Sequence, residues 1–148
     1  MAVGRPVKLT WPCAEDMTRD QYRPMAASRI RIGLNAAGAI TAWSNRSVSP
    51  SIQAQRGRVL GATGDSNGTE GGRVLPYKFG SRLVDYVVHP SPIPVGYWRS
   101  VGYSINGFAV ESAIDEAALA AGIDPLLFSA SNSSPPAPIR SPRARSPC

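Results

Sequence analysis

Residues that build metal and redox sites are scarce in this sequence of 148 residues. The two cysteines, Cys13 and Cys148, lie far apart, and the chain has neither a CxxC pair nor a Cys/His cluster. Neither a disulfide framework nor a cysteine-ligated metal or iron–sulfur site is therefore expected. His89 is the only histidine, and no second ligand lies near it in the sequence. The sequence predicts no metal site in this chain.

Long apolar runs are also missing. No stretch approaches the roughly twenty apolar residues that a membrane span needs. The N-terminal sequence MAVGRPVKLTWP lacks the apolar core of a signal peptide. We therefore expect no membrane span, and the sequence leaves the compartment open.

Half of the formal net charge comes from one end of the chain. The formal net charge is +6, and the segment 129–148 contains three arginines and no acidic residue. The basic residues are not interleaved with aromatic ones as in a surface that stacks on single-stranded nucleic acid, and zinc-finger spacing is missing. Nucleic acid is therefore not favoured as a partner. A small, non-catalytic basic protein that binds anions or nucleic acid is the alternative from a different functional class.

Glycine and proline are plentiful, with 14 of each, and they favour turns and strands over long helices. Apolar residues alternate with polar ones over 28–34 and resume that pattern over 39–48. Residues 35–38 tolerate the positive φ of a tight turn, so the three segments predict a β-hairpin. Shorter apolar patterns predict two further strands, at 5–11 and 82–89.

Helical signals are confined to one turn at 14–19 and to the second half of the chain. A main helix is expected over 106–121, with Gly122 as its stop. Its predicted inner face consists of Phe108, Ser112, Ala113, Ala117 and Ala121. Asp124 and Pro125 are typical of a second helix start, which the sequence after them does not develop.

The predicted fold class is α+β, a β-hairpin and short strands followed by one main helix. Residues 1–128 form the predicted domain, with a long polar loop over 49–75. Residues 129–148 consist mainly of Pro, Ser and Arg without a period, so a disordered tail is expected there.

The most informative local pattern is the glycine-flanked turn at 96–106, which runs directly into the predicted main helix. Backbone N–H groups and the positive end of the helix dipole suit an anionic ligand at such a place. Gly102 would let the ligand approach closely, and Arg99 would add a bidentate contact. The simpler interpretation is that the glycines serve tight turns while Trp98 packs and Arg99 is solvated. On the local pattern alone the simpler interpretation is favoured, because short Gly-rich motifs often match by chance.

Other candidates for chemistry have a plainer explanation. Glu111, Asp115 and Glu116 could act as general bases, but their spacing favours a solvated acidic stripe on a helix. His89 precedes a proline in a turn, where a surface or capping histidine is the more common case. No nucleophile elbow is present, so hydrolase chemistry has no support.

Two separated segments carry a family resemblance. The first is PIPVGYWRSVGYSINGFAVESAIDEAALAAGIDPLLF, residues 92–128. The second is GRPVKLTWPCAEDMTRDQYRP, residues 4–24, followed by SRIRIGLNAAGAITAW, residues 28–43. The first resembles the second cofactor-binding region of the molybdopterin-binding large subunit of molybdenum hydroxylases, the xanthine dehydrogenase and aldehyde oxidase family. The second resembles the segment that follows the first Gly-rich cofactor loop of that subunit. The resemblance is nearest to the isoquinoline 1-oxidoreductase β-subunit type.

The resemblance implies a cofactor-binding loop made of Trp98, Arg99, Ser100, Val101 and Gly102. Arg99 matches the arginine of the family's Phe-Arg-Gly-Phe-Gly-type loop beside molybdenum, and Trp98 matches the aromatic residue before it. Val101 falls where xanthine oxidases place a phenylalanine that stacks on the substrate. This departure favours the isoquinoline and aldehyde branch over xanthine. No catalytic residue is assigned in this chain, because the family's catalytic glutamate is expected beyond it.

The family's subunits hold a molybdopterin cofactor, expected here in its cytosine dinucleotide form, and hydroxylate aldehydes or N-heterocycles with a molybdenum-bound hydroxide. The implied partners are the remainder of the large subunit, a small [2Fe-2S] subunit that receives the electrons, and the substrate. By family the compartment is cytoplasmic or periplasmic. Full-length subunits are longer, and the tail loses the family's pattern as it would after a frameshift. We therefore expect a truncated fragment that is inactive alone, with a pseudogene product as a further alternative.

Overall fold

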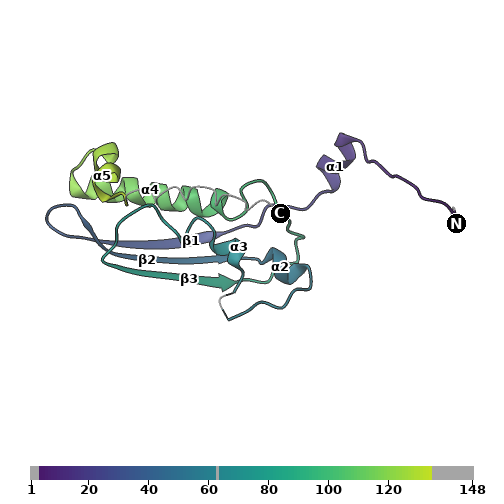
Figure 1. Ribbon diagram of the computed structural model, residues 1–148, viewed down its shortest axis with the longest axis horizontal. Coiled ribbons are helices and arrows are strands. Elements are labelled where there is room, and N and C mark those ends of the chain that lie inside the picture. The colour runs from purple at the N-terminus through teal and green to yellow at the C-terminus, as the bar shows by residue number, and fades with distance from the viewer. Residues whose placement is uncertain (1–3, 63, 135–148) are drawn as a thin grey trace, which may run out of the picture.

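A computed structural model describes residues 4–62 and 64–134. Its centre is a three-stranded sheet with the strand order β1-β2-β3, and the two longest helices cover one face of that sheet (Figure 1). The sheet strands are β1 (Ala27–Leu34), β2 (Ile40–Ser49) and β3 (Ser81–Val88), and the covering helices are α4 (Tyr103–Ala121) and α5 (Pro125–Asn132). The predicted α+β fold is confirmed.

The predicted hairpin forms as β1 and β2, which pair antiparallel with Ile32 opposite Trp43. The side chain of Asn35 closes the turn, since its Oδ1 accepts hydrogen bonds from the backbone N–H of Ala37 (3.0 Å) and Ala39 (2.9 Å). Gly38 has a φ of 78°, which an L side chain rarely adopts. The turn chemistry read from the sequence is therefore the chemistry that the structure uses.

The strand predicted at 82–89 is β3, and it pairs parallel with β2, with Val84 opposite Asn45. Parallel neighbours need a long crossover connection, because the chain must return to the same end of the sheet. The predicted loop 49–75 is part of that crossover. It holds two helices of one turn each, α2 (Ile52–Gln55) and α3 (Ser66–Thr69), so the expectation of no element in it was wrong. Side-chain caps rather than an apolar pattern form both helices.

Helix α4 begins at Tyr103, earlier than predicted, and ends at Gly122, whose φ of 68° confirms it as the stop. The predicted inner face was wrong at Phe108, which is 78% exposed. The buried stripe repeats at the spacing of a helix and consists of Asn106, Val110, Ile114, Ala117 and Ala118. With Trp43 of β2 and Phe128 of α5, its apolar members form the hydrophobic core.

A second helix does develop, contrary to the prediction. The carboxylate of Asp124 caps α5 by accepting hydrogen bonds from the N–H groups of Leu126 (3.0 Å) and Leu127 (3.2 Å). At its far end Asn132 is buried, and its Oδ1 accepts a hydrogen bond from the N–H of Ile40 (3.0 Å). Residues 129–134 therefore belong to the folded unit and not to a tail. The rest of the predicted tail, 135–148, lies outside the described residues.

The strand predicted at 5–11 does not form, because these residues find no strand partner in the described part of the chain. Val7, Leu9 and Trp11 are all more than half exposed, so the alternating pattern there buries nothing. The helical turn predicted next to it is α1 (Cys13–Arg19). It stands away from the sheet in Figure 1.

Two structural features of residues 4–62 and 64–134 bear on function. None of the helices there is both long and apolar enough to cross a membrane. Within the same residues, no three or more His, Cys, Asp or Glu side chains cluster so as to hold a metal ion.

Candidate functional site

The loop from Trp98 to Gly102 has an unusual backbone. Inside it, the N–H of Val101 donates to the carbonyl of Trp98 (3.0 Å), and the N–H of Tyr103 donates to that of Ser100 (2.9 Å). Ser100 and Val101 have φ angles of 72° and 43°, a region that β-branched residues avoid. Such strain persists only where the surroundings hold it, and it is concentrated at functional sites.

The two glycines of this segment are required by protein packing. A Cβ on Gly102 would lie 2.1 Å from the carbonyl oxygen of Asn67, and one on Gly96 would lie 2.2 Å from Oε1 of Gln21. The close neighbour of Gly102 is therefore backbone of the same chain, not open space for a ligand. Both glycines thus allow close packing within the chain, which differs from the tight-turn role and from the ligand approach that the sequence suggested.

Arg99 and Ser100 form the exposed tip of the loop. In the structure as described, neither side chain makes a hydrogen bond or an ion pair. Trp98 is 47% exposed, and its Nε1 donates a hydrogen bond to the carbonyl of Gln21 (2.9 Å). The structure thus presents a guanidinium and a hydroxyl beside a half-exposed indole.

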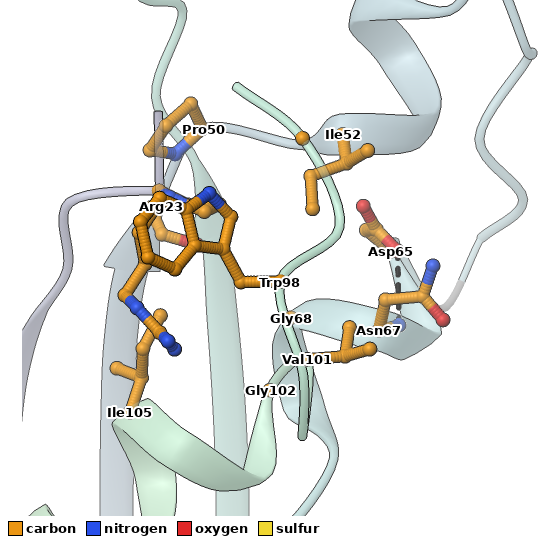
Figure 2. Close-up of a pocket in the computed structure, with 13 residues that line it drawn as sticks. Arg23, Pro50, Ile52, Asp65, Asn67, Gly68, Trp98, Val101, Gly102 and Ile105 are labelled. Atoms are coloured by element: carbon orange, nitrogen blue, oxygen red, sulfur yellow. Dashed lines mark hydrogen bonds between the residues drawn. The ribbon is translucent and has the colours of Figure 1, made fainter. Parts of the chain in front are cut away.

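Arg23 flanks the loop and was not identified as a site residue from the sequence. Its guanidinium carbon lies 5.1 Å from the centroid of the Trp98 ring, and its NH1 donates a hydrogen bond to Oγ of Ser104. Figure 2 shows Arg23 and Trp98 together on one side of a small cavity, with Asp65 and Asn67 on the other.

A glutamine holds the proline-rich segment that leads into the loop. Nε2 of Gln55, the last residue of α2, donates to the carbonyls of Ser91 (3.1 Å) and Ile93 (3.0 Å). Its Oε1 accepts a hydrogen bond from the N–H of Val95 (2.8 Å). The prolines make this segment extended, as the sequence predicts, but Gln55 fixes its place.

The cavity behind the loop is small. Its wall includes the buried carboxylate of Asp65, which accepts hydrogen bonds from Oγ of Ser51 (2.5 Å) and the N–H of Asn67 (2.9 Å). The volume of about 20 Å³ is room for roughly one water molecule. Any larger ligand would have to contact the outer side of the loop, where Arg99 and Ser100 are exposed.

The acidic residues of α4 and the histidine lie outside this arrangement. Glu111, Asp115, Glu116 and His89 are exposed, in agreement with a solvated acidic stripe and a surface histidine. Glu111 accepts a hydrogen bond from the hydroxyl of Tyr77 (2.5 Å). Burial, and next the hydrogen bond to Glu111, raise the pKa of Tyr77 to about 12.

Comparison with known proteins decides the family. The family model of the molybdopterin cofactor-binding domain matches residues 1–133. The chain belongs to this family. The aldehyde oxidoreductase molybdenum-binding subunit PaoC of Escherichia coli (strain K12) is 33% identical over 128 residues, which are 86% of this chain and 16% of PaoC. PaoC of Escherichia coli O157:H7 matches to the same extent.

Solved structures agree in fold. Quinoline 2-oxidoreductase from Pseudomonas putida 86 superposes with a TM-score of 0.59 at 20% identity, covering 78% of this chain and 15% of that protein. Aldehyde oxidoreductase from Desulfovibrio gigas gives a TM-score of 0.58 at 18% identity, covering 78% of this chain and 12% of that protein. The family resemblance read from the sequence is confirmed, and this chain spans 16% of the length of its curated relatives.

Proposed function

We propose that the loop Trp98–Gly102 forms one wall of the molybdopterin site of an oxidoreductase that hydroxylates aldehydes or N-heterocycles. The observation that carries the proposal is Arg99, exposed and without a protein partner among the described residues, on a loop that many contacts hold in a strained shape. A guanidinium in that position suits an anionic group such as the phosphate of the cofactor.

Two backbone N–H groups at this loop are engaged within it. The N–H groups of Val101 and Tyr103 already donate within the loop, so they are not available to a ligand. No acceptor is described for the N–H groups of Arg99, Ser100 and Gly102, so these groups, with the dipole of α4, which is 19 residues long, can still add to the expected anion contact. Arg99 binds the anion, Ser100 adds a hydroxyl, and Trp98 covers the flank of the group.

The described residues supply binding and orientation. When bound, the cofactor supplies the redox centre for hydroxylation. Glu111, Asp115, Glu116 and His89 do not line the cavity behind the loop. A drug-sized ligand fills a pocket of about 300–1,000 Å³, so the loop needs further walls to enclose the cofactor. We therefore expect no turnover by the 148-residue chain alone.

Aldehydes are the substrate class that we favour. Support comes from the name of the relatives at 33% identity, which are subunits of an aldehyde oxidoreductase. Val101 in place of an aromatic side chain fits the same choice, because it cannot stack on a purine. The cytosine dinucleotide form of the cofactor and a small [2Fe-2S] partner subunit follow from the family resemblance and remain predictions.

Cofactor retention tests the proposal. The chain is expressed in bacterial cells that make molybdopterin and purified at low salt, and its pterin is released, oxidised and quantified by fluorescence. We expect pterin above background in the unmodified chain and at least about tenfold less in Arg99→Met, since a charge-assisted bond contributes about 1.5–3 kcal/mol. Arg31→Met, which removes the same charge from an exposed position of β1, serves as the control. Equal amounts of pterin in Arg99→Met and Arg31→Met would contradict the proposal. So would the absence of pterin from the unmodified chain.

A further inference from the structure

We propose that Arg23 is a positioning residue for the loop Trp98–Gly102, acting from a segment that lies far from the loop in sequence. The inference rests on the proposed function only for what the loop binds. The contacts through which Arg23 acts belong to the chain itself.

The backbone on either side of Arg23 is tied to the segment that enters the loop. The N–H of Tyr22 donates to the carbonyl of Pro94 (3.0 Å), and the N–H of Gly96 donates back to the carbonyl of Tyr22 (3.0 Å). Next to this bridge, Nε1 of Trp98 donates to the carbonyl of Gln21. Arg23 therefore starts from a backbone that is fixed relative to the loop.

The side chain of Arg23 contacts both ends of the loop. At one end its guanidinium stacks over the ring of Trp98. At the other end it donates to Oγ of Ser104, and that hydroxyl donates to the carbonyl of Val101 (2.9 Å). Trp98 and, through Ser104, Val101 are thus both tied to Arg23. This leaves the side chain of Arg99 unengaged while its backbone is held.

The contacts explain why an arginine suits this position. Its planar guanidinium can stack on an indole with one face and donate hydrogen bonds along its edge. A lysine ammonium can donate to Ser104 but has no plane to stack. The pair of contacts also supplies the restraint that the strained φ angles of Ser100 and Val101 require.

Amide hydrogen exchange of the 148-residue chain, without cofactor, tests the positioning role. The reporters are the N–H groups of Val101 and Tyr103, which bond within the loop, and the reference is the N–H of Ile114 in the buried stripe of α4. In Arg23→Met we expect exchange of both reporters to accelerate at least tenfold while the reference is unchanged. Arg23→Lys should restore part of the protection by keeping the hydrogen bond, and Arg31→Met should change nothing.

Each outcome decides the inference. Unchanged reporters in Arg23→Met would overturn it, because Arg23 would then be a neighbour of the loop without effect on it. Acceleration of the reference together with the reporters would mean that the whole fold is lost, and the decision then passes to a second variant. Should Arg23→Met fail to fold, Ser104→Ala provides the second test, with faster exchange at Val101 expected and unchanged exchange contradicting the role. Because no cofactor is added, a failure here is distinct from a failure of pterin retention in the unmodified chain.

Discussion

The two ends of the sheet are built in different ways. Toward α5, the sheet and helices enclose apolar side chains, among them Trp43, Ile114 and Phe128, each at most 2% exposed. Toward α2 and α3, at the opposite end in Figure 1, polar side chains such as Gln55, Asp65 and Arg23 make hydrogen bonds to backbone N–H groups or to other side chains. The first region supplies stability, and the second fixes the shape of a loop. The candidate site therefore depends on contacts between parts of the chain that lie far apart in sequence.

The largest expected effect lies in the apolar region. Phe128→Ala removes a fully buried ring and leaves a cavity, so we expect the free energy of unfolding to fall by about 3–5 kcal/mol. Leu127→Ala is the matched control, because its side chain is 64% exposed, and we expect a change below about 1 kcal/mol. Urea denaturation of both variants provides the measurement. Similar losses in the two would mean that α5 does not pack as described.

The polar region should respond next most strongly, through Asp65. Its carboxylate is buried and accepts hydrogen bonds from Ser51 and from the N–H of Asn67. Through the second bond Asp65 caps the N-terminus of α3. Asp65→Ala leaves those donors unsatisfied, and we expect a loss of about 2–3 kcal/mol in urea denaturation. Asp65→Asn, which keeps one acceptor oxygen, should lose less. A loss below about 0.5 kcal/mol in the alanine variant would show that hydrogen bonds do not hold this end.

Alkaline pH should weaken the apolar region through Tyr77. Its pKa is raised to about 12 by burial and then by Glu111, so the folded chain holds the phenol proton more tightly than the unfolded chain does. Tyr77 therefore contributes on the order of 2 kcal/mol to the free energy of unfolding below pH 10. This contribution is lost as pH rises from 10 to 12. Denaturation across this pH range should show a smaller decline in Tyr77→Phe. The pKa of Tyr86 is also raised by burial, so Tyr86→Phe serves for comparison. A decline in Tyr77→Phe as steep as in the unmodified chain would contradict the assignment.

The smallest expected effect concerns the strain in the loop. Val101→Gly relieves a positive φ, and that relief offsets the lost side chain and the greater flexibility of the unfolded chain. We expect unfolding free energy to change by less than about 1 kcal/mol. Val101→Ala keeps the strain and should be the less stable of the two variants in urea. The reverse order would mean that the loop is not strained at this residue.

The difference between the apolar and the polar region also explains which elements the sequence could predict. Period-two and helical patterns gave β1, β2, β3 and α4, because a buried apolar face repeats along one element. The error at Phe108 arose because glycines and alanines leave the direction of a helix face poorly marked. The parallel pairing of β3 depends on a long crossover, and α2 and α3 depend on caps, none of which leaves a repeating pattern.

The candidate loop was identified, yet its supports were not. The hydrogen bond between Arg23 and Ser104 joins residues 81 positions apart in the sequence, and the one between Gln55 and Val95 joins residues 40 positions apart. A lone arginine or glutamine in a polar segment carries no local signal that distinguishes it from a solvated residue. The local pattern already offered Arg99 as an anion contact, but only the family resemblance favoured it over a solvated arginine and added Ser100.

We propose that Arg99 binds the molybdopterin cofactor at the outer side of this loop. The most direct measurement is ¹⁹F NMR of the chain labelled with 5-fluorotryptophan, titrated with molybdopterin under exclusion of air. The resonance of Trp98, assigned from Trp98→Phe, should shift and saturate, whereas those of Trp11 and the buried Trp43 should not. In Arg99→Met the titration should require at least about tenfold more cofactor. An unmoved Trp98 resonance, or an identical titration in Arg99→Met, would contradict the claim.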